Sequence, residues 1–425
     1  MGKSSLILVL GFSLVVIMVG PNLAREANRA YENYLNYANI TNVHNIAVSA
    51  ASIAASKIFF DSSWSTGYSN VSFGNGSYDI IIQNLANNRK KLIAYGHLNN
   101  AMSYNRLFGN RLQTINDTVE VLIQPSNFSK FAVYLNSMGG VSWFTGDTVY
   151  GMCHVEGTMN VLGTPVFYGK VTTKNGTNPA TLPSGTTNPK FYGGLQKGVS
   201  IPLPTNINQF TSAATSGGKV FNPPASGSGA YQVNFIFNAN GTVQYQEYKG
   251  ATKVKDSTVA LTSLAPNGAI LVNSGNITVK GTYSGRVSIG TAGTGGGNVQ
   301  IVGDVVAAND PRTNPNSTDM LGIIADNSVT LPILSPVKHD YLIEASIFCR
   351  AGTFSADLNN TMGKQGAVTV YGSLQTNTVG AFSNGNGTTI SNGYQNHFTF
   401  DNRLLVDAPP AYPNTNHFEV LSWKE

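Results

Sequence analysis

The first sixty residues show two successive patterns of apolar positions. Residues 4–20 are apolar almost without interruption, a run of about seventeen residues that spans roughly 25 Å as a helix. From Asn22 to Thr66 there is neither Gly nor Pro, and apolar or small residues recur at three- to four-residue steps, the period of a helix. The first segment, 1–60, therefore predicts one long helix, on the order of 85 Å if continuous. Pro21 predicts a bend in it, because proline removes a backbone hydrogen bond and clashes with the preceding turn.

Beyond residue 60 the pattern changes to short alternating runs separated by Gly, Asn and Pro. The runs 78–83, 119–123 and 131–135 predict strands, whereas 84–105 suggests a helix. A polar stretch rich in Pro and Gly over 174–193 is typical of a domain boundary. We therefore expect a small β-rich domain over 61–200 and a second domain over 201–425.

The region 268–383 is repetitive. Its short β-runs include GNITVKG, GRVSIG and GAVTVYGSL, and Ile277, Val287 and Val299 each begin an apolar alternation at intervals of about 10 to 12 residues. Such spacing favours a parallel β-helix of stacked rungs, with a hairpin meander as the alternative. The expected fold class is α+β, mostly β: a long N-terminal helix, a small β domain and a parallel β-helix or solenoid-like domain.

The composition predicts a polar surface with few charges, which is common in extracellular and appendage proteins. Only 11% of residues are charged, and the net charge of +5 reflects scarce acids rather than dense bases. The densest basic cluster, Arg89 to Lys91, is interpreted as a solvated turn, so no nucleic-acid partner is predicted. Cys153 and Cys349 lie in alternating apolar runs, which favours two buried thiols over a long-range disulfide, and their pairing stays open.

Few motifs point to catalysis. The six histidines are scattered, and two H-x-E triplets, at His154 and His417, lack the P-C-x-x-C half that a zinc deaminase needs. His154 lies in an alternating strand and is interpreted as a buried rung histidine. Because β-helices often carry polysaccharide-degrading enzymes, we considered a carboxylate site formed by residues of one loop and its flank: Asp304, Asp310, Arg312 and Asp319. We expect no enzyme and no catalytic residues.

The loop ANDPRTNPNSTD is the one candidate for a bound cation. Its oxygen ligands are Asp310, Asn314, Asn316 and Asp319, and Ca²⁺ prefers carboxylate and amide oxygens. The spacing is not that of an EF-hand, and the same residue types stabilise turns through their own backbone. A structural loop is favoured over a calcium site, and no other metal or cofactor is predicted.

Three stretches carry a resemblance to a known family: GDTVYGMCHVEGTMNVLGTPVFYGKVTT (146–173), IVGDVVAANDPRTNPNSTDMLGIIA (301–325) and GYQNHFTFDNRLLVDAPPAYP (393–413). With the first helix they resemble a bacterial family of surface proteins in which a type IV pilin-like helix precedes a β-helix-like module. The helix itself resembles that of type IV pilins, in which an apolar half packs in the filament core, or in the membrane before assembly. A proline near position 22 kinks the family's helix, and its second half packs on a β domain.

The resemblance implies a structural subunit of an extracellular type IV pilus-like filament, or fimbrium. Its partners would be copies of itself, the inner membrane before assembly, and surface glycans or adhesion partners. The implied assembly residues lie in the apolar half of the helix: Leu6, Leu8, Leu10, Phe12, Val15, Ile17, Val19 and Pro21. The family has a Gly at its processing site and a Glu five residues into the mature chain. Here Lys3 follows Gly2 and the first carboxylate is Glu26, so processing and that pairing stay open.

Three alternatives are kept. A membrane-tethered module that binds glycans or proteins shares the anchor but forms no filament. A β-helix polysaccharide-degrading enzyme is less favoured. A secretory signal cleaved after Ala24 would remove the apolar half, although the helical pattern continues past that point. The filament's symmetry and its role in adhesion, motility, secretion or DNA uptake stay open, as does glycosylation.

Overall fold

The protein consists of two compact units. The computed structural model describes residues 2–85, 89–105, 109–294, 296–359, 361–385 and 390–425. Unit 1 comprises Met1–Ser126 and Asn416–Glu425, and unit 2 comprises Asn127–Thr415. The division falls at 126/127 and 415/416, not near residue 200 as the loop-rich stretch suggested. That stretch, 174–193, contains strands that pair within unit 2, so its Pro and Gly residues form turns inside one unit.

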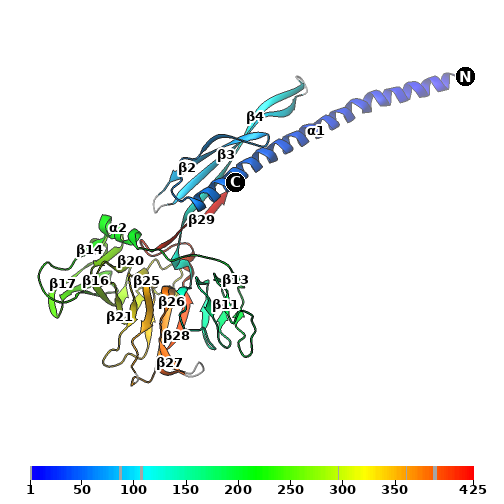
Figure 1. Cartoon of the computed structure of the whole chain (residues 1–425). Coiled ribbons are helices and arrows are strands. Elements are labelled where there is room, and N and C mark those ends of the chain that lie inside the picture. The colour runs from blue at the N-terminus through cyan, green and yellow to red at the C-terminus, as the bar shows by residue number, and fades with distance from the viewer. Residues whose placement is uncertain (1, 86–88, 106–108, 295, 360, 386–389) are drawn as a thin grey trace. The chain divides into compact units, whose positions relative to one another are not determined.

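Unit 1 is one long helix and a five-stranded sheet in the order β1-β2-β3-β4-β29 (Figure 1). Strands β1 to β4 pair antiparallel in sequence order. The last strand of the chain lies beside β4 at the edge of the sheet. The elements are α1 Lys3–Phe60, β1 Tyr68–Phe73, β2 Gly76–Asn84, β3 Lys90–Asn105, β4 Gly109–Asn127 and β29 Asn414–Lys424.

Small residues bring the second half of α1 close to the sheet. Ala47, Ala50, Ala51 and Ala54 are fully buried, and they pack with apolar side chains of β2, β3 and β4. A β-carbon on Gly96 would lie 2.4 Å from the carbonyl oxygen of Val43, so the helix touches the strand backbone there. The Ala-rich pattern therefore predicts a helix–sheet interface correctly, and burial rather than intrinsic propensity stabilises this half.

The helix expected over 84–105 is wrong. Residues 90–105 form β3, which pairs with β2 on one side and β4 on the other. Residues 86–88 lie outside the described part of the chain. Two neighbouring strands hydrogen-bond the backbone of β3 along both edges, and its pairing outweighs local propensity. Leu92 and Ala94 are fully buried in the cluster beneath α1.

Unit 2 is a three-faced solenoid of parallel strands, which confirms the expected class. Within each turn the chain passes through face A, face B and face C, and each strand pairs with a strand of the next turn. Ile277 pairs directly with Val299 on face B, whereas Val287 lies on face A. One turn of the solenoid, from Ile277 to Val299, therefore contains both of the intervals of about 10 to 12 residues that were noted in the sequence.

Face A contains ten strands or strand parts in stacking order: β14 Lys219–Phe221, β18 Ala269–Asn273, β20 Arg286–Ala292, β22 Met320–Ala325, the start of β25 Ser346–Ala356, the later part of β26 Lys364–Val379, β5 Val133–Ser137, β7 Cys153–Val155, β10 Val171–Thr173 and β13 Leu195–Lys197. Face C contains the ends of β19 Asn276–Tyr283 and β21 Val299–Ala307, then β24 Tyr341–Ile343, the middle of β26, β28 Ile390–Phe400, β6 Thr148–Tyr150, β9 Val166–Phe167 and β12 Lys190–Phe191.

Face B is formed by the remaining parallel segments. These are β15 Tyr231–Phe237, the starts of β19 and β21, β23 Val329–Leu331 and the end of β25. A separate pair, β8 Met159–Asn160 with β11 Thr177–Asn178, follows β7 and β10 in the chain. The other elements are β16 Thr242–Lys249, β17 Thr252–Ala260, β27 Ser383–Gly385, α2 Asn208–Gly217, α3 Leu261–Leu264, η2 Phe128–Lys130 and η3 Asn402–Leu405.

The chain does not follow the stack from end to end. It enters in the middle at β5 and winds to one end at β13. It then crosses to the opposite end and winds back from β14 until β26 pairs with β5, as Leu374 pairs with Val133. The amide of Phe128 donates to the carbonyl of Pro413 at 3.0 Å, so unit 2 begins and ends at one place. Unit 2 is consequently an insertion between β4 and β29 (Figure 1).

Residues 198–218, the crossing segment, connect the two ends of the stack along the outside of face A. Ile201 accepts a hydrogen bond from the Tyr134 hydroxyl at 2.6 Å, and α2 ends the segment against β14 and β18. Phe210 of α2 is fully buried in a cluster with Leu271, Ile324 and Phe348. The strands of face A that lie beneath this segment, such as β22, are thus buried on both sides, which explains the unbroken apolar run MLGIIA.

Candidate functional site

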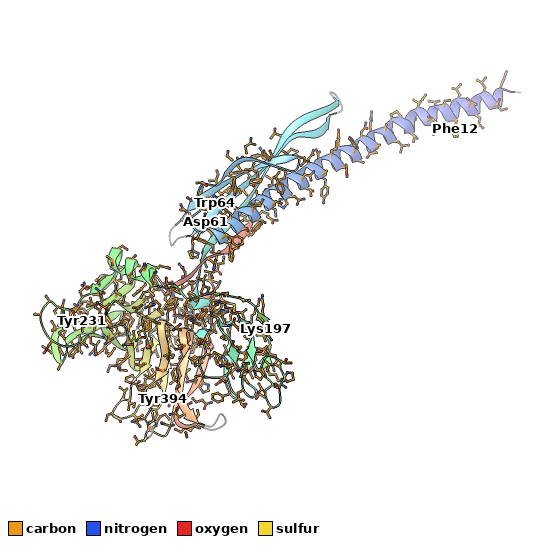
Figure 2. All side chains as sticks on the ribbon, in the orientation of Figure 1. Phe12, Asp61, Trp64, Lys197, Tyr231 and Tyr394 are labelled. Carbon is orange, nitrogen blue, oxygen red and sulfur yellow. The ribbon has the colours of Figure 1, made fainter. Side chains whose placement is uncertain are left out.

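The N-terminal half of α1 carries the predicted assembly residues on a fully exposed helix. The side chains of Leu6, Leu8, Leu10, Phe12, Val15, Ile17 and Val19 are between 47% and 71% exposed. The most hydrophobic 18-residue window of α1 has a mean hydropathy of 2.4, and none of it is buried. Figure 2 shows Phe12 on this half, where no strand of unit 1 covers the helix.

Apolar side chains surround the whole circumference of this half. A helix at the surface of a soluble unit has one apolar stripe, whereas residues 6–10 are five consecutive exposed apolar residues. Such a segment needs an apolar environment on every side, which a bilayer or a bundle of like helices provides. Because this segment is long enough to cross a bilayer and also to pack in a bundle, its composition is compatible with both environments.

Pro21 lies inside α1, and the helix continues through it. Proline has no amide hydrogen, so the carbonyl of Ile17 loses its helical donor. One residue later the side chain of Asn22 donates to the carbonyl of Met18 at 3.1 Å. This bond goes to the neighbouring carbonyl and not to that of Ile17.

A collar of charged residues ends the apolar half. It consists of Arg25, Glu26, Arg29 and Glu32, and Arg29 donates to Glu26 at 2.8 Å. Both members of this pair are 69% exposed, so the pair adds little stability. The collar instead marks a polar boundary, because charged side chains are costly inside hydrocarbon. Beyond it α1 becomes the half that packs on the sheet.

The candidate cation loop uses its oxygens for internal bonds. Asp310 binds the guanidinium of Arg312 at 2.8 Å, and Asn314 accepts from the amide of Asn316 at 3.1 Å. Asp319 is buried and accepts from the amides of Gly285 and Asn309. No group of three or more His, Cys, Asp or Glu side chains suited to a metal occurs among the described residues. The loop has the bonds of a structural turn, and calcium binding stays a hypothesis.

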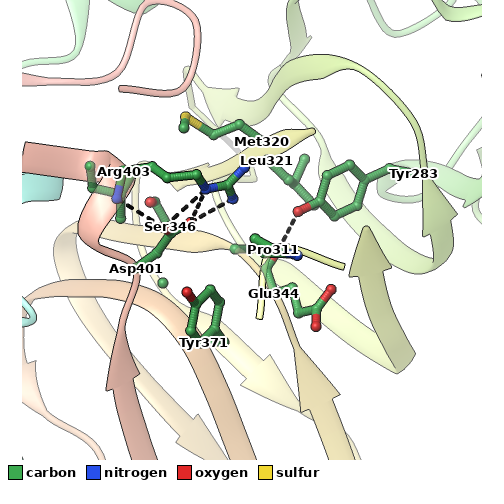
Figure 3. A pocket seen from close by; sticks show the side chains of 12 residues that line it. Tyr283, Pro311, Met320, Leu321, Glu344, Ser346, Tyr371, Asp401 and Arg403 are labelled. Atoms are coloured by element: carbon green, nitrogen blue, oxygen red, sulfur yellow. Dashed lines mark hydrogen bonds and ion pairs between the residues drawn. The ribbon is translucent and has the colours of Figure 1, made fainter. Parts of the chain in front are cut away.

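A recess opens beside this loop and is lined by Pro311 of the loop and by the carboxyl-bearing residues Glu344 and Asp401 (Figure 3). The empty volume of the recess is about 220 Å³, including the part that is open to solvent. Arg312 contacts both Asp310 and Glu344 at 2.8 Å. Glu344 is buried, and this burial raises the pKa of its carboxyl, whereas hydrogen bonding from Arg312 lowers the pKa of Asp310. The wall on the other side is formed by Tyr371, Asp401 and Arg403.

The enzyme candidates named from the sequence lie beside this recess and do not line it. Asp310 and Arg312 were named as enzyme candidates, but Asp304 and Asp319 are used elsewhere: Asp304 binds the amide of Leu342 at 2.9 Å. Glu344 was missed, although a lone carboxyl within the apolar run YLIEASIF is a signal for a buried acid. The same guanidinium therefore contacts Asp310, which the sequence pointed to, and Glu344, which it did not.

Both H-x-E triplets are structural. His154 is fully buried, and its ring nitrogens face Thr172 at 2.7 Å and Glu156 at 3.1 Å. This agrees with a satisfied rung histidine. In unit 1, His417 stacks on Phe59 with ring centroids 4.8 Å apart, while the Glu419 carboxylate accepts from Gln124. Neither triplet belongs to a described metal cluster.

The two cysteines and Lys90 are also buried. Cys153 and Cys349 are free thiols in the stack, and burial raises the pKa of each to about 12. Lys90, from the basic cluster, is buried rather than solvated because its ammonium donates to the carbonyls of Ser62 and Trp64 at 2.8 and 2.9 Å. Lys91 pairs with Glu120 at 2.7 Å. Lys90 and Lys91 therefore form bonds within unit 1.

Comparison with known proteins gives one solved structure of note. The chain is similar to the competence-associated pilin ComZ from Thermus thermophilus, with 11% sequence identity and a TM-score of 0.38. The similarity covers 90% of this chain and 96% of that one. No family model matches the chain, and no curated protein matches it.

Proposed function

We propose that this protein is a structural subunit of an extracellular type IV pilus-like filament. Its apolar half-helix would anchor the subunit in the inner membrane and then pack among the helices of other copies. The β-rich units would face outward on the cell surface. The proposal includes no enzymatic activity, no cofactor and no nucleic-acid partner.

One observation carries the proposal: α1 is a single helix with two differently covered halves. The half beyond the collar is buried under a sheet through alanines, while the half before it is apolar on all sides and uncovered. A simple anchor needs only hydrophobicity, and a flexible linker would serve to join it to a domain. Because α1 continues as one helix from the apolar half into the folded unit, packing of the apolar halves in a bundle would also set the positions of the folded units around it.

The first test is assembly of the full chain and of a truncated chain. Electron microscopy of the purified full-length protein, or of material sheared from cells, is expected to show filaments. Deletion of residues 1–24 removes the apolar half up to the collar and is expected to give a soluble monomer. Filaments formed by the truncated chain would contradict the proposal.

A scrambled variant separates assembly from anchoring. Residues 4–20 keep their composition but change their order, so their hydropathy and length stay the same while the side chains that meet between copies do not. We expect this variant to remain in the membrane fraction and to lose filaments. A conservative variant, Val15→Ile, serves as the matched control and is expected to keep both.

The second candidate is a membrane-tethered binding module, favoured by the same hydropathy of α1. If this second function is correct, the unaltered chain and the scrambled variant are both expected to be monomeric in detergent, and neither is expected to form filaments. Mass measurement of the mature protein also tests both candidates, because cleavage after Ala24 would remove the apolar half on which each depends.

A further inference from the structure

Three tyrosines form an exposed ladder on face C. Tyr150 ends β6, Tyr168 follows β9 and Tyr192 follows β12, and their side chains are 49%, 48% and 68% exposed. The Tyr150 and Tyr168 rings stack with centroids 4.7 Å apart and planes 5° from parallel. Tyr168 and Tyr192 stack at 5.3 Å and 22°. The three rings thus repeat at about the spacing of the strands that carry them.

The register of the solenoid holds this ladder in place. Val149 pairs with Phe167, and Phe167 pairs with Phe191, so the residues that follow them are also in line. Beneath the tyrosines, the rings of Phe167 and Phe191 stack with centroids 5.2 Å apart, and Phe167 is fully buried. The tyrosine side chains are therefore ordered before any ligand arrives, which lowers the entropic cost of binding.

The phenol hydroxyls gather in one row. The pKa of Tyr168 is raised, first by the neighbouring Tyr150 phenol, and also by the phenol of Tyr192. Each hydroxyl can donate one hydrogen bond and accept others. The ladder consequently offers apolar ring edges and a line of hydrogen-bonding groups along the same stripe.

The stripe continues toward the recess and carries almost no charge. Tyr150 pairs with Thr399, which pairs with Tyr371 at the wall of the recess. The adjacent outward positions include His397 and Lys190, both exposed. No Asp or Glu occurs in β6, β9, β12 or β28, all of whose residues are described. The surface is aromatic, hydroxyl-bearing and nearly neutral.

We propose that the tyrosine ladder, Tyr150, Tyr168 and Tyr192, binds an extended, uncharged polysaccharide lying along face C. Sugar rings combine hydroxyl groups with apolar C–H faces, and the ladder presents phenol hydroxyls and apolar ring edges along its length. Tyr192, the most exposed of the three, leaves the outer face of its ring free for a sugar to stack upon. This binding site is additional to the filament role and does not depend on it.

Charge and width distinguish this ligand from two other polymers. Nucleic acid needs several Lys or Arg side chains to neutralise phosphates, and β6, β9, β12 and β28 contribute only Lys190. A stable protein interface buries about 800 Å² on each partner around an apolar centre, whereas this stripe is one side chain wide and flanked by polar residues. A single extended glycan strand matches its length and width.

The test measures binding of defined oligosaccharides to the full-length protein in detergent. The probes are hexasaccharides of β-1,4-linked glucose, xylose, mannose and N-acetylglucosamine and of α-1,4-linked glucose, examined by calorimetry. We expect at least one to bind, and Tyr168→Ala to weaken that binding tenfold or more. Tyr192→Ala, at the open end of the ladder, is expected to weaken it as well, while Tyr168→Phe keeps the ring and loses less.

Matched controls keep the outcome clear. Tyr37→Ala removes a tyrosine that is 72% exposed on α1 and is expected to leave binding unchanged. Circular dichroism checks that each variant is folded, and filament formation by Tyr168→Ala is expected to persist, which separates this proposal from the assembly role. Binding of no hexasaccharide, or binding unaffected in both Tyr168→Ala and Tyr192→Ala, would overturn the proposal. So would a 20-base-pair DNA duplex that binds in place of the sugars and is released by Tyr168→Ala.

Discussion

At the scale of single residues, Glu156 is one attachment of the crossing segment to the stack. Its carboxylate accepts from the Ser200 hydroxyl and the Ile201 amide, both at 2.5 Å, and from the Lys174 ammonium at 2.8 Å. Burial alone would raise the pKa of Glu156, but these hydrogen bonds outweigh it and lower the pKa to about 2. The folded protein therefore stabilises the ionised form of the Glu156 carboxylate.

Replacement of this carboxylate tests its role. Glu156→Gln is expected to lower the free energy of unfolding by about 1.5–3 kcal/mol, because bonds to an ionised acceptor are lost in a buried place. Urea unfolding followed by circular dichroism measures this loss of stability, with the exposed Asp357→Asn as control.

The same carboxylate predicts a pH dependence. Because the pKa of Glu156 falls from 4.5 to about 2 on folding, the stabilisation by this carboxylate is complete above pH 4.5 and is lost between pH 4.5 and 2. An acid-unfolding profile identical in Glu156→Gln and the unaltered protein would contradict this role.

The loop residues Asp310 and Asp319 permit a second test. Since Arg312 and backbone amides already use their oxygens, we expect millimolar calcium to leave the melting temperature unchanged and to release no heat in a titration. Asp319→Asn is nevertheless expected to lower the melting temperature, because the buried carboxylate accepts two backbone amides. A calcium-dependent rise in melting temperature that disappears in Asp310→Asn would restore the cation site.

At the scale of elements, the crossing segment covers face A. Phe210→Ala is expected to cost about 3–5 kcal/mol, as for other fully buried aromatic side chains, because α2 then leaves a cavity above β18 and β20. The exposed Leu162→Ala is the control and is expected to change stability by less than about 0.5 kcal/mol. Equal, small effects in urea unfolding would mean that α2 is not part of the cooperative unit.

Elements were predictable where local pattern and burial agree. The apolar run, the alanine stretch and the alternating runs 78–83 and 119–123 lie in elements of the predicted type, and the run 131–135 overlaps β5 from residue 133 onward. The strand β3 was mistaken for a helix because its partners β2 and β4 supply the pairing that local sequence does not display. Likewise, face A required the crossing segment to explain why strands such as AILVN have no polar side.

At the scale of the whole molecule, unit 2 is inserted between β4 and β29. The Phe128 amide bonds the Pro413 carbonyl, so the two chain crossings are close enough for a short turn to replace the insertion. We expect a chain in which Asn-Gly replaces residues 128–413 to fold as unit 1 alone. Its circular dichroism should show helix and antiparallel sheet, with a cooperative thermal transition.

The same variant examines how the units contribute to assembly. If the apolar half of α1 drives polymerisation, the shortened chain is expected to form thinner filaments that still require residues 1–24. Combining the deletion with the scrambled order of 4–20 is the control and is expected to abolish filaments. A shortened chain that aggregates without a folded sheet would show that unit 1 depends on the insertion.

The sequence alone determined the long helix with its two halves and the β-rich remainder, because apolar periodicity and turn residues encode these locally. It favoured stacked parallel strands over a hairpin meander, and the strand pairing of the structure decided between them. The tertiary structure decided the domain limits, the pairing of β26 with β5, the recess around Glu344 and the tyrosine ladder. Each of these joins residues distant along the chain, and their proximity depends on strand register. A one-residue slip in that register would send the tyrosines inward and leave face C without its row of hydroxyls.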